Sequence, residues 1–249
     1  MPENVEIREC TTLEELAECV QLQRDVFALP EVELSPVRHL IVTRNAGGFT
    51  LGAYDGARLA GFVLSVPAFI RGERAFYSHM TAVHADYQSH GIGARLKWAQ
   101  RDRALSEGVR YIKWTFEPIK ARNAHFNLNK LGAIVGEYEA NFYGIDYTTA
   151  PQGKESIGLA SDRLFAEWQL ESEKVAVLAA GQPWTEPAEP TKEIAIMSDW
   201  FGLVDRDPRE ALAEQVRIRG EFQDALGGGL VVRSFERGGE HPAYQLYAV

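Results

Sequence analysis

The stretch SHMTAVHADYQSHGIGARL, residues 78–96, decides the fold class of this chain. Residues 74–83 have the pattern of a strand, and residues 92–107 that of a helix with Ile92, Leu96 and Ala99 on one face. Between them lies a turn that contains Gly91 and Gly93. In a strand–turn–helix of this kind several backbone N–H groups converge at the positive end of the helix dipole. The stretch therefore predicts a turn that binds a diphosphate.

Other nucleotide-binding turns do not fit these residues. A Walker loop needs Gly-Lys-Ser/Thr after four spacer residues, and the turn has no such sequence. A dinucleotide fingerprint needs Gly or Ala at position 96, where Leu96 stands, and belongs near the first strand of its fold. A glycine-containing turn without a ligand stays open as the simple alternative.

The elements before and after the turn predict mixed α/β structure. Before it we expect a strand over Val5–Glu9, a helix after a capping box of Thr11/Thr12 with Glu14/Glu15, a helix capped by Ser35, and a hairpin that turns at Asp55-Gly56. After it we expect strands over 111–117, 133–143 and 162–170, with a short helix over 123–131. A linker or surface loop over 182–190, a helix over 208–226 and a hairpin over 230–248 follow. We predict one domain over residues 1–170 and a C-terminal α+β extension, residues 171–249, packed on it.

The pattern Q-x-x-G-x-G at Gln88–Gly93, after Ala82-Val83 and Asp86-Tyr87, resembles the coenzyme A signature of the GNAT acyltransferase superfamily. The order of the expected elements over residues 4–170 is similar as well. The resemblance implies a mixed, mostly antiparallel sheet with a splayed parallel strand pair, flanked by helices. It also implies transfer of an acyl group from acyl-CoA, acetyl-CoA by default, to the amine of a small molecule such as an amino acid.

The same resemblance implies which residues contact coenzyme A. The turn would hold the pyrophosphate through its backbone N–H groups, and an amide of residue 82 or 83 would face the thioester oxygen. Asn123 matches a cofactor-contacting position at the start of the helix that follows. The candidate cofactor-binding residues are Ala82, Val83, Gln88, His90, Gly91, Ile92, Gly93, Ala94 and Asn123.

Attack of an amine on a thioester needs an acceptor for the ammonium proton and a donor for the thiolate. Glu117 is the candidate base, because it ends a strand and lies on the polar face of that strand. The alternative is that Glu117 is simply a solvated carboxylate at a strand end. His79 and His84 are candidates for sharing or relaying that proton. The sequence departs from the family where Leu128 stands in place of the usual tyrosine acid. Tyr143 is our first substitute for that acid.

Four further residues are candidates for the site. Tyr147 is the second candidate acid, Arg163 and Asp162 are candidate substrate contacts, and Arg163 or Arg122 would supply the cation that succinyl-CoA requires. Asp162 and Arg163 would equally well pair with each other or with the surface.

Composition favours small partners. The net charge is −9, from 35 acidic and 26 basic residues, without the basic stripe that nucleic acid or anionic lipid would require. No apolar stretch approaches the length of a membrane span, and the first residues do not resemble a signal peptide, so we expect a cytoplasmic protein. Cys10 and Cys19 are too few for a zinc site or a disulfide framework, and we expect no metal.

Two classes of function remain at this point. The first is the acyl-CoA dependent N-acyltransferase described above. The second is a non-catalytic acyl-CoA binding or interaction module, which Leu128 favours and Glu117 disfavours. A homodimer is left open.

Overall fold

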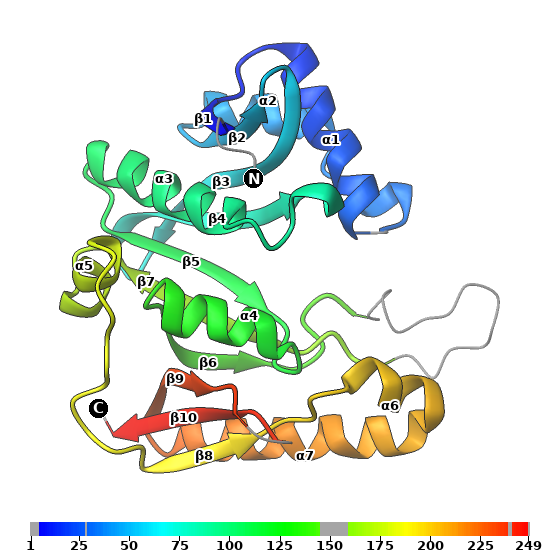
Figure 1. The fold of residues 1–249 in the computed structure, drawn as a ribbon, viewed down its shortest axis with the longest axis vertical. Coiled ribbons are helices and arrows are strands. Elements are labelled where there is room, and N and C mark those ends of the chain that lie inside the picture. The colour runs from blue at the N-terminus through cyan, green and yellow to red at the C-terminus, as the bar shows by residue number, and fades with distance from the viewer. Residues whose placement is uncertain (1–4, 28, 145–158, 239–240, 249) are drawn as a thin grey trace. The chain divides into compact units, whose positions relative to one another are not determined.

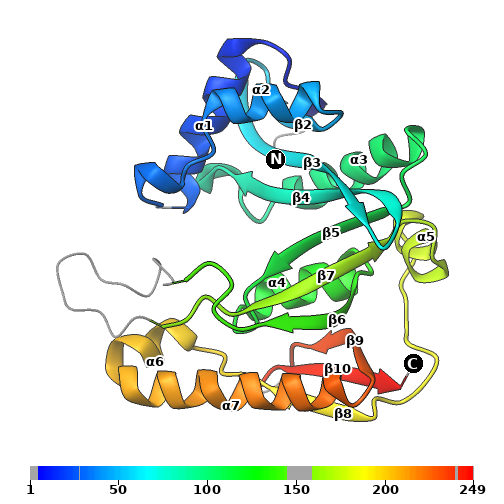
Figure 2. The same ribbon diagram turned by 180° about the vertical axis from the view of Figure 1, so that it is seen from behind.

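The computed structural model describes residues 5–27, 29–144, 159–238 and 241–248. The chain divides into two compact units, residues 1–113 and 114–249, drawn in Figure 1 and, from behind, in Figure 2. The boundary lies inside strand β5, Tyr111–Phe116.

The first unit is a sheet with helices on both faces. Its elements are β1 (Val5–Glu9), α1 (Leu13–Phe27), η1 (Glu31–Glu33), α2 (Val37–Asn45), β2 (Phe49–Asp55), β3 (Arg58–Ile70), β4 (Glu73–Val83), η2 (Ala85–Tyr87), α3 (Ile92–Ser106) and the start of β5. Strands β1 to β4 are antiparallel neighbours in chain order. Helices α1 and α2 lie on one face and α3 on the other (Figures 1 and 2).

Strand β4 has a different neighbour on each side. Its antiparallel ladder with β3 continues to the pair Gly61–Val83, whereas its parallel ladder with β5 joins Phe76 to Ile112 and Tyr77 to Lys113. The mixed, mostly antiparallel sheet with a parallel pair is therefore confirmed.

One of the two predicted helix caps is present. The Glu15 amide donates to Thr12 Oγ1 at 3.2 Å, and the Thr12 amide donates to the Glu15 carboxylate at 3.0 Å, so the capping box of α1 is confirmed. Amide donors at Thr12 and Thr11 and the Arg8 guanidinium lower the pKa of Glu15 to about 2. The predicted Ser35 cap of α2 is wrong: the capping residue is Pro36. The Ser35 hydroxyl lies 3.2 Å from His79 Nε2 instead.

The second unit continues from β5 in the strand order β5-β7-β6-β9-β10-β8. Its elements are α4 (Ala121–His125), the π-helix η3 (Phe126–Lys130), β6 (Ile134–Glu139), β7 (Arg163–Gln169), α5 (Glu173–Ala179), β8 (Lys192–Ala195), α6 (Trp200–Arg206), α7 (Pro208–Gly227), β9 (Leu230–Glu236) and β10 (Ala243–Ala248). Figure 1 shows α4 in front of β6 and β7, and Figure 2 shows α7 in front of β8 and β10, so the two helices cover opposite faces.

Residues after position 170 contact earlier residues of this unit at Pro118, Asn129 and Asp162. The Tyr244 hydroxyl donates to the Pro118 carbonyl at 2.6 Å, and the Phe235 amide donates to Asn129 Oδ1 at 3.0 Å. Arg219 of α7 binds both carboxylate oxygens of Asp162, at 2.9 and 3.0 Å. The C-terminal segment therefore shares a core with the strands that precede it, while a domain boundary at residue 170 stays a prediction.

Within the described part of the chain, no helix combines the length and the apolar character needed to cross a bilayer.

Candidate active site

The turn before α3 has the backbone geometry expected of an anion-binding turn. Ser89 and Gly91 both have positive φ, 67° and 79°, and Gly91 caps the helix. The first amide bonded at this end of α3 is that of Arg95, which donates to the Gly91 carbonyl at 3.0 Å. The amides of Ile92, Gly93 and Ala94 precede it and point out of the helix end, as first-turn amides do.

The space beside the two glycines is open. A Cβ added at Gly91 would meet no atom within 4 Å, and one at Gly93 would meet Val83 Cγ2 at 3.8 Å. Glycine at position 91 is therefore required by the positive φ rather than by crowding from the protein. A ligand could therefore approach the backbone beside both glycines.

Gln88 stabilises the turn from within. Its side chain donates to the Val83 carbonyl at 3.1 Å, and its amide donates to the Ala85 carbonyl at 3.2 Å. A contact between coenzyme A and the Gln88 amide would have to replace that second bond. The Ile92 side chain is buried and His90 is exposed, so any contact of Ile92 with phosphate falls to its backbone amide.

The hydrogen-bonding direction of the backbone alternates along strand β4, and this distinguishes the amides of Ala82 and Val83 at its end. The His84 amide donates to the Ala60 carbonyl of β3 at 2.9 Å. In an antiparallel ladder every second residue bonds the same neighbour, so Ala82 also faces β3 and Val83 faces away from it. The bond from Gln88 to the Val83 carbonyl agrees with that direction. Of the two candidates, Val83 is the residue whose amide points away from the β3 ladder.

Glu117, in the second unit, lies between two cations. Lys120 Nζ is 2.5 Å from its Oε2, and Arg163 Nη2 is 3.8 Å from its Oε1. The Glu117 side chain is 15% exposed, so it is neither sealed in the core nor freely solvated. Both ion pairs orient the carboxylate.

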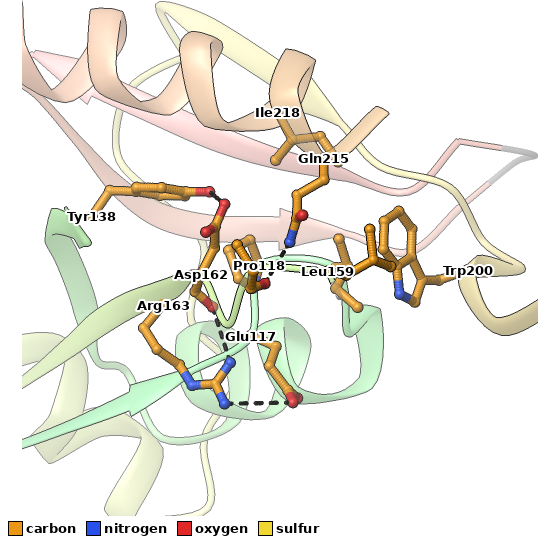
Figure 3. A pocket seen from close by; sticks show the side chains of 11 residues that line it. Glu117, Pro118, Tyr138, Leu159, Asp162, Arg163, Trp200, Gln215 and Ile218 are labelled. Atoms are coloured by element: carbon orange, nitrogen blue, oxygen red, sulfur yellow. Dashed lines mark hydrogen bonds and ion pairs between the residues drawn. The ribbon is translucent and has the colours of Figure 1, made fainter. Parts of the chain in front are cut away.

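Glu117 and Arg163 line a pocket whose other side comes from the C-terminal segment (Figure 3). Trp200 of α6 and Gln215 and Ile218 of α7 complete the lining, together with Ile119 and Leu159. The empty space is about 330 Å³, part of it open to solvent.

Tyr143 lies near Arg163, one of the two cations beside Glu117, but is largely exposed. The tyrosine is 53% exposed, its hydroxyl is 3.4 Å from Thr115 Oγ1, and the Arg163 guanidinium lies 5.2 Å from its ring centre. Tyr147, the second candidate acid, lies outside the described residues.

Asp162 and Arg163 do not form an ion pair with each other. The buried Asp162 carboxylate accepts bonds from Arg219, the Asn141 amide and the Tyr138 hydroxyl, the last at 2.5 Å. Burial, with that hydrogen bond, raises the pKa of Tyr138. Arg163 donates to the Asp162 backbone carbonyl at 3.0 Å and turns its other end toward Glu117. Asp162 is therefore a structural anchor for α7.

The two candidate histidines lie in the first unit. His79 is beside Ser35 and packs edge-on against His39, with ring centres 6.0 Å apart. Desolvation of its ring and the charge that His39 can carry lower the pKa of His79, although the residue is exposed at the surface. His84 caps η2 by accepting from the Asp86 amide at 3.2 Å, which gives it a structural role.

The remaining candidates lie on or near α4. Asn123 is half-buried in that helix and Arg122 is exposed, whereas Leu128, in the π-helix, is fully buried. The described residues contain no group of three or more His, Cys, Asp or Glu side chains that could hold a metal ion.

Comparison with known proteins identifies a family for part of this chain. The model of the acetyltransferase (GNAT) family matches residues 13–132. The chain carries a GNAT-family acetyltransferase domain. No curated protein matches the chain at a significant level.

Solved GNAT structures share the fold. An N-acetyltransferase from Staphylococcus aureus Mu50 is 14% identical, with 68% of this chain and 100% of that chain covered and a TM-score of 0.54. The ribosomal-protein-S18-alanine N-acetyltransferase from Escherichia coli is 15% identical, with 68% and 96% covered and a TM-score of 0.53. A GNAT family acetyltransferase from Elizabethkingia anophelis with acetyl-CoA bound is 16% identical, with 68% and 99% covered and a TM-score of 0.50. At these identities the likeness is one of fold alone.

Sequence reasoning missed Trp200 and Gln215 as pocket residues. They lie more than 80 positions after Glu117, so no local spacing connects them to it. One signal was present: Gln215 interrupts the buried stripe of α7, which is otherwise Ala211, Ile218, Phe222 and Ala225.

Proposed function

We propose that this GNAT domain transfers an acyl group from acyl-CoA directly to the amine of a small molecule such as an amino acid. Acetyl-CoA is the default donor, and succinyl-CoA is the alternative if Arg163 or Arg122 can bind its second carboxylate. We place the activity in the cytoplasm. The observation that carries the proposal is the turn before α3, where positive φ at Ser89 and Gly91 and three outward amides match the geometry that an anion site requires.

The chemistry assigns a proton step to Glu117. The amine nitrogen bonds to the thioester carbonyl carbon, the C–S bond breaks, sulfur leaves as a thiolate, and the nitrogen must lose a proton. A carboxylate has about four lone-pair positions, so the contacts to Lys120 and Arg163 leave Glu117 able to accept that proton. The Val83 amide, directed away from β3, is our candidate donor to the oxygen that gains charge.

The thiolate is the second proton site. Tyr143 is our candidate donor because its side chain is largely exposed and the residue belongs to the same unit as Glu117. His79 is a candidate for relaying protons.

Replacing Glu117 by the isosteric glutamine tests the assignment. We expect Glu117→Gln to lower kcat by roughly 100- to 10,000-fold, the usual contribution of a general base. The measurement is thiol release at saturating acetyl-CoA with a panel of amino acids, with coenzyme A affinity followed by calorimetry. That affinity should stay within about twofold of wild type, because the amides that bind phosphate lie elsewhere in the chain.

Lys120→Met is the matched control. It removes the closest cation but keeps the carboxylate, so kcat should fall far less than in Glu117→Gln. A wild-type kcat in Glu117→Gln would remove Glu117 from the mechanism. Coenzyme A binding without thiol release for any amine would favour the non-catalytic module instead.

A further inference from the structure

Strand β4 has a β-bulge at His79. Its ladder with β3 joins Met80 to Leu64 and Ser78 to Ser65, so β4 has one extra residue between these two pairs. A bulge redirects the side chains beside it. Met80 packs against the buried cluster that α1 and α2 contribute to, and the His79 side chain contacts α2 and the segment before it. The bulge therefore directs His79 to the face of the sheet that these two helices cover.

Ser35, in the segment before α2, is held in place from the core. Gln23 of α1 pairs with both of its backbone groups: Oε1 accepts from the Ser35 amide at 2.9 Å, and Nε2 donates to the Ser35 carbonyl at 3.1 Å. Gln23 is 0% exposed and Ser35 is 7% exposed. Because a buried amide with both ends paired has little freedom to move, Gln23 fixes the position of Ser35. The Ser35 hydroxyl then lies 3.2 Å from His79 Nε2.

This contact decides which nitrogen of His79 can exchange a proton. A charged imidazole carries a hydrogen on both ring nitrogens, so in that form Nε2 donates and the Ser35 hydroxyl accepts. Nδ1 of His79 has no hydrogen-bond partner among the residues that the structure describes. Nδ1 is therefore the ring atom that is left to take up or release a proton.

Two effects oppose a charge on His79, and Ser35 counteracts them. Desolvation of the ring lowers the pKa of His79, and so does the charge that His39 can carry. Among the described residues of α1, α2 and the adjacent strands, His39 is the titratable group whose charge acts on His79. Since the Ser35 hydroxyl accepts from the charged ring, it favours the protonated form. His79 is then mostly neutral near pH 7 but can still hold a proton.

His79 occupies the part of β4 that the proposed reaction uses. The parallel ladder of β4 with β5 has its last pair at Tyr77 and Lys113, and Val83, our candidate donor to the thioester oxygen, ends the strand. His79 lies between these two points. A proton held on its Nδ1 would be on the strand along which the proposed function places acyl-CoA.

We propose that Ser35, fixed by Gln23, is a positioning residue that holds His79 by Nε2 and stabilises the proton that Nδ1 relays from the amine nitrogen to solvent. Only N–H bonds form and break at His79, and the acyl group is never attached to it. This inference rests on the proposed acyltransferase function for its kinetic test, and a titration tests the proton on His79 without any activity.

The titration follows the ring signals of His79 in the ¹⁵N-labelled chain from pH 8 to pH 5. The signals of His79 are those missing from the spectrum of His79→Gln. We expect Ser35→Ala to lower the pKa of His79 by roughly 0.5–1 unit, because a hydrogen bond to a charged group is about twice as strong as one to a neutral group. Ser35→Thr keeps the hydroxyl and should restore the wild-type pKa. If Ser35→Ala does not fold, Ser35→Cys, with a weaker acceptor, takes its place.

Ser78→Ala is the matched control. Ser78 is also buried, at 5% exposed, and precedes His79, but its hydroxyl accepts from Lys97 and Gln100 of α3. Its loss should leave the pKa of His79 unchanged. An unchanged pKa in Ser35→Ala, or an equal fall in Ser78→Ala, would overturn the proposal.

The kinetic test is a double-mutant cycle. The kcat for thiol release at saturating acetyl-CoA is measured for Ser35→Ala in the wild-type chain and in His79→Gln. We expect a fall of about tenfold in the wild-type chain, as loss of one hydrogen bond predicts, and no further fall in His79→Gln, because Ser35 acts through His79. The KM for acetyl-CoA should not change.

A fall of equal size in both backgrounds would show that Ser35 supports the fold and not His79, and a wild-type kcat in His79→Gln would remove the relay. Either result would overturn the proposal. If the wild type released no thiol with any amine, the proposed function would fail, and the titration would still decide whether Ser35 stabilises the proton on His79.

Discussion

Gly93 offers a test in which stability and coenzyme A binding should change in opposite directions. It is the second residue of α3, its φ is not positive, and a Cβ there would meet only Val83 Cγ2, at 3.8 Å. Alanine in a helix is more stable than glycine by roughly 0.5–1 kcal/mol, so Gly93→Ala should stabilise the fold by up to about that amount. If phosphate lies against the Gly93 amide, the new methyl group should displace it.

The size of the binding defect follows from one lost contact. A hydrogen bond to a charged group contributes about 1.5–3 kcal/mol, which corresponds to roughly 10- to 150-fold in Kd. Calorimetry with coenzyme A measures the Kd, and urea unfolding measures the stability. Gly220→Ala is the control, since Gly220 lies within α7 with no atom within 4 Å of its added Cβ. It should raise stability similarly and leave the Kd unchanged. Coenzyme A affinity equal to wild type in Gly93→Ala would show that phosphate does not approach this amide.

Three further predictions concern proton transfer, packing and pH. Tyr143→Phe should lower kcat without changing the Kd for coenzyme A if its hydroxyl protonates the thiolate; an unchanged kcat, measured by thiol release, would mean that the thiolate leaves unassisted. Arg219→Met should cost about 3 kcal/mol in urea unfolding, because it leaves the buried Asp162 carboxylate without its cation, and a loss below about 1 kcal/mol would contradict that role. Burial lowers the pKa of Lys97 well below its usual value, so the unfolded chain binds more protons than the folded chain, and the free energy of unfolding should rise with pH toward about 10.4. Lys97→Met should flatten that rise in unfolding measured from pH 7 to 10. An unaltered slope in the variant would refute this reasoning.

Much of the fold could be predicted because its signals are local. The hairpin of β2 and β3 needs only two alternating segments around a glycine turn, and α7 needs only a periodic apolar stripe with Pro208 at its start. Helices α5 and α6 were missed, since each has seven residues and a helix of that length has too few turns to show a period. Strand β6 ends at Glu139, four residues earlier than predicted, and the segment that follows turns instead.

The candidate site likewise has a part that local sequence predicts and a part that depends on tertiary contacts. The backbone geometry of the turn before α3 was predictable, because it depends on consecutive residues, and phosphate binding at that helix end stays a prediction. The Ser35 cap failed for a tertiary reason: the backbone of Ser35 is bonded by the Gln23 side chain, at 2.9 and 3.1 Å, and its hydroxyl pairs with His79. The pocket around Glu117 depends on α6 and α7, whose positions follow from contacts such as Arg219 with Asp162 and not from any motif.

The outermost strands of the sheet influence how copies of this chain can meet. β8 has four residues and begins with Lys192 and Glu193, and β1 alternates charged residues at Glu6 and Arg8. A second copy that added a strand to either edge would have to bring its backbone alongside these charged side chains, and short, charged edges oppose such pairing. Association through continuous sheets, whether an ordered dimer or an amyloid-like aggregate, is thus disfavoured at both edges. Any homodimer of this chain is expected to form through its helices or loops.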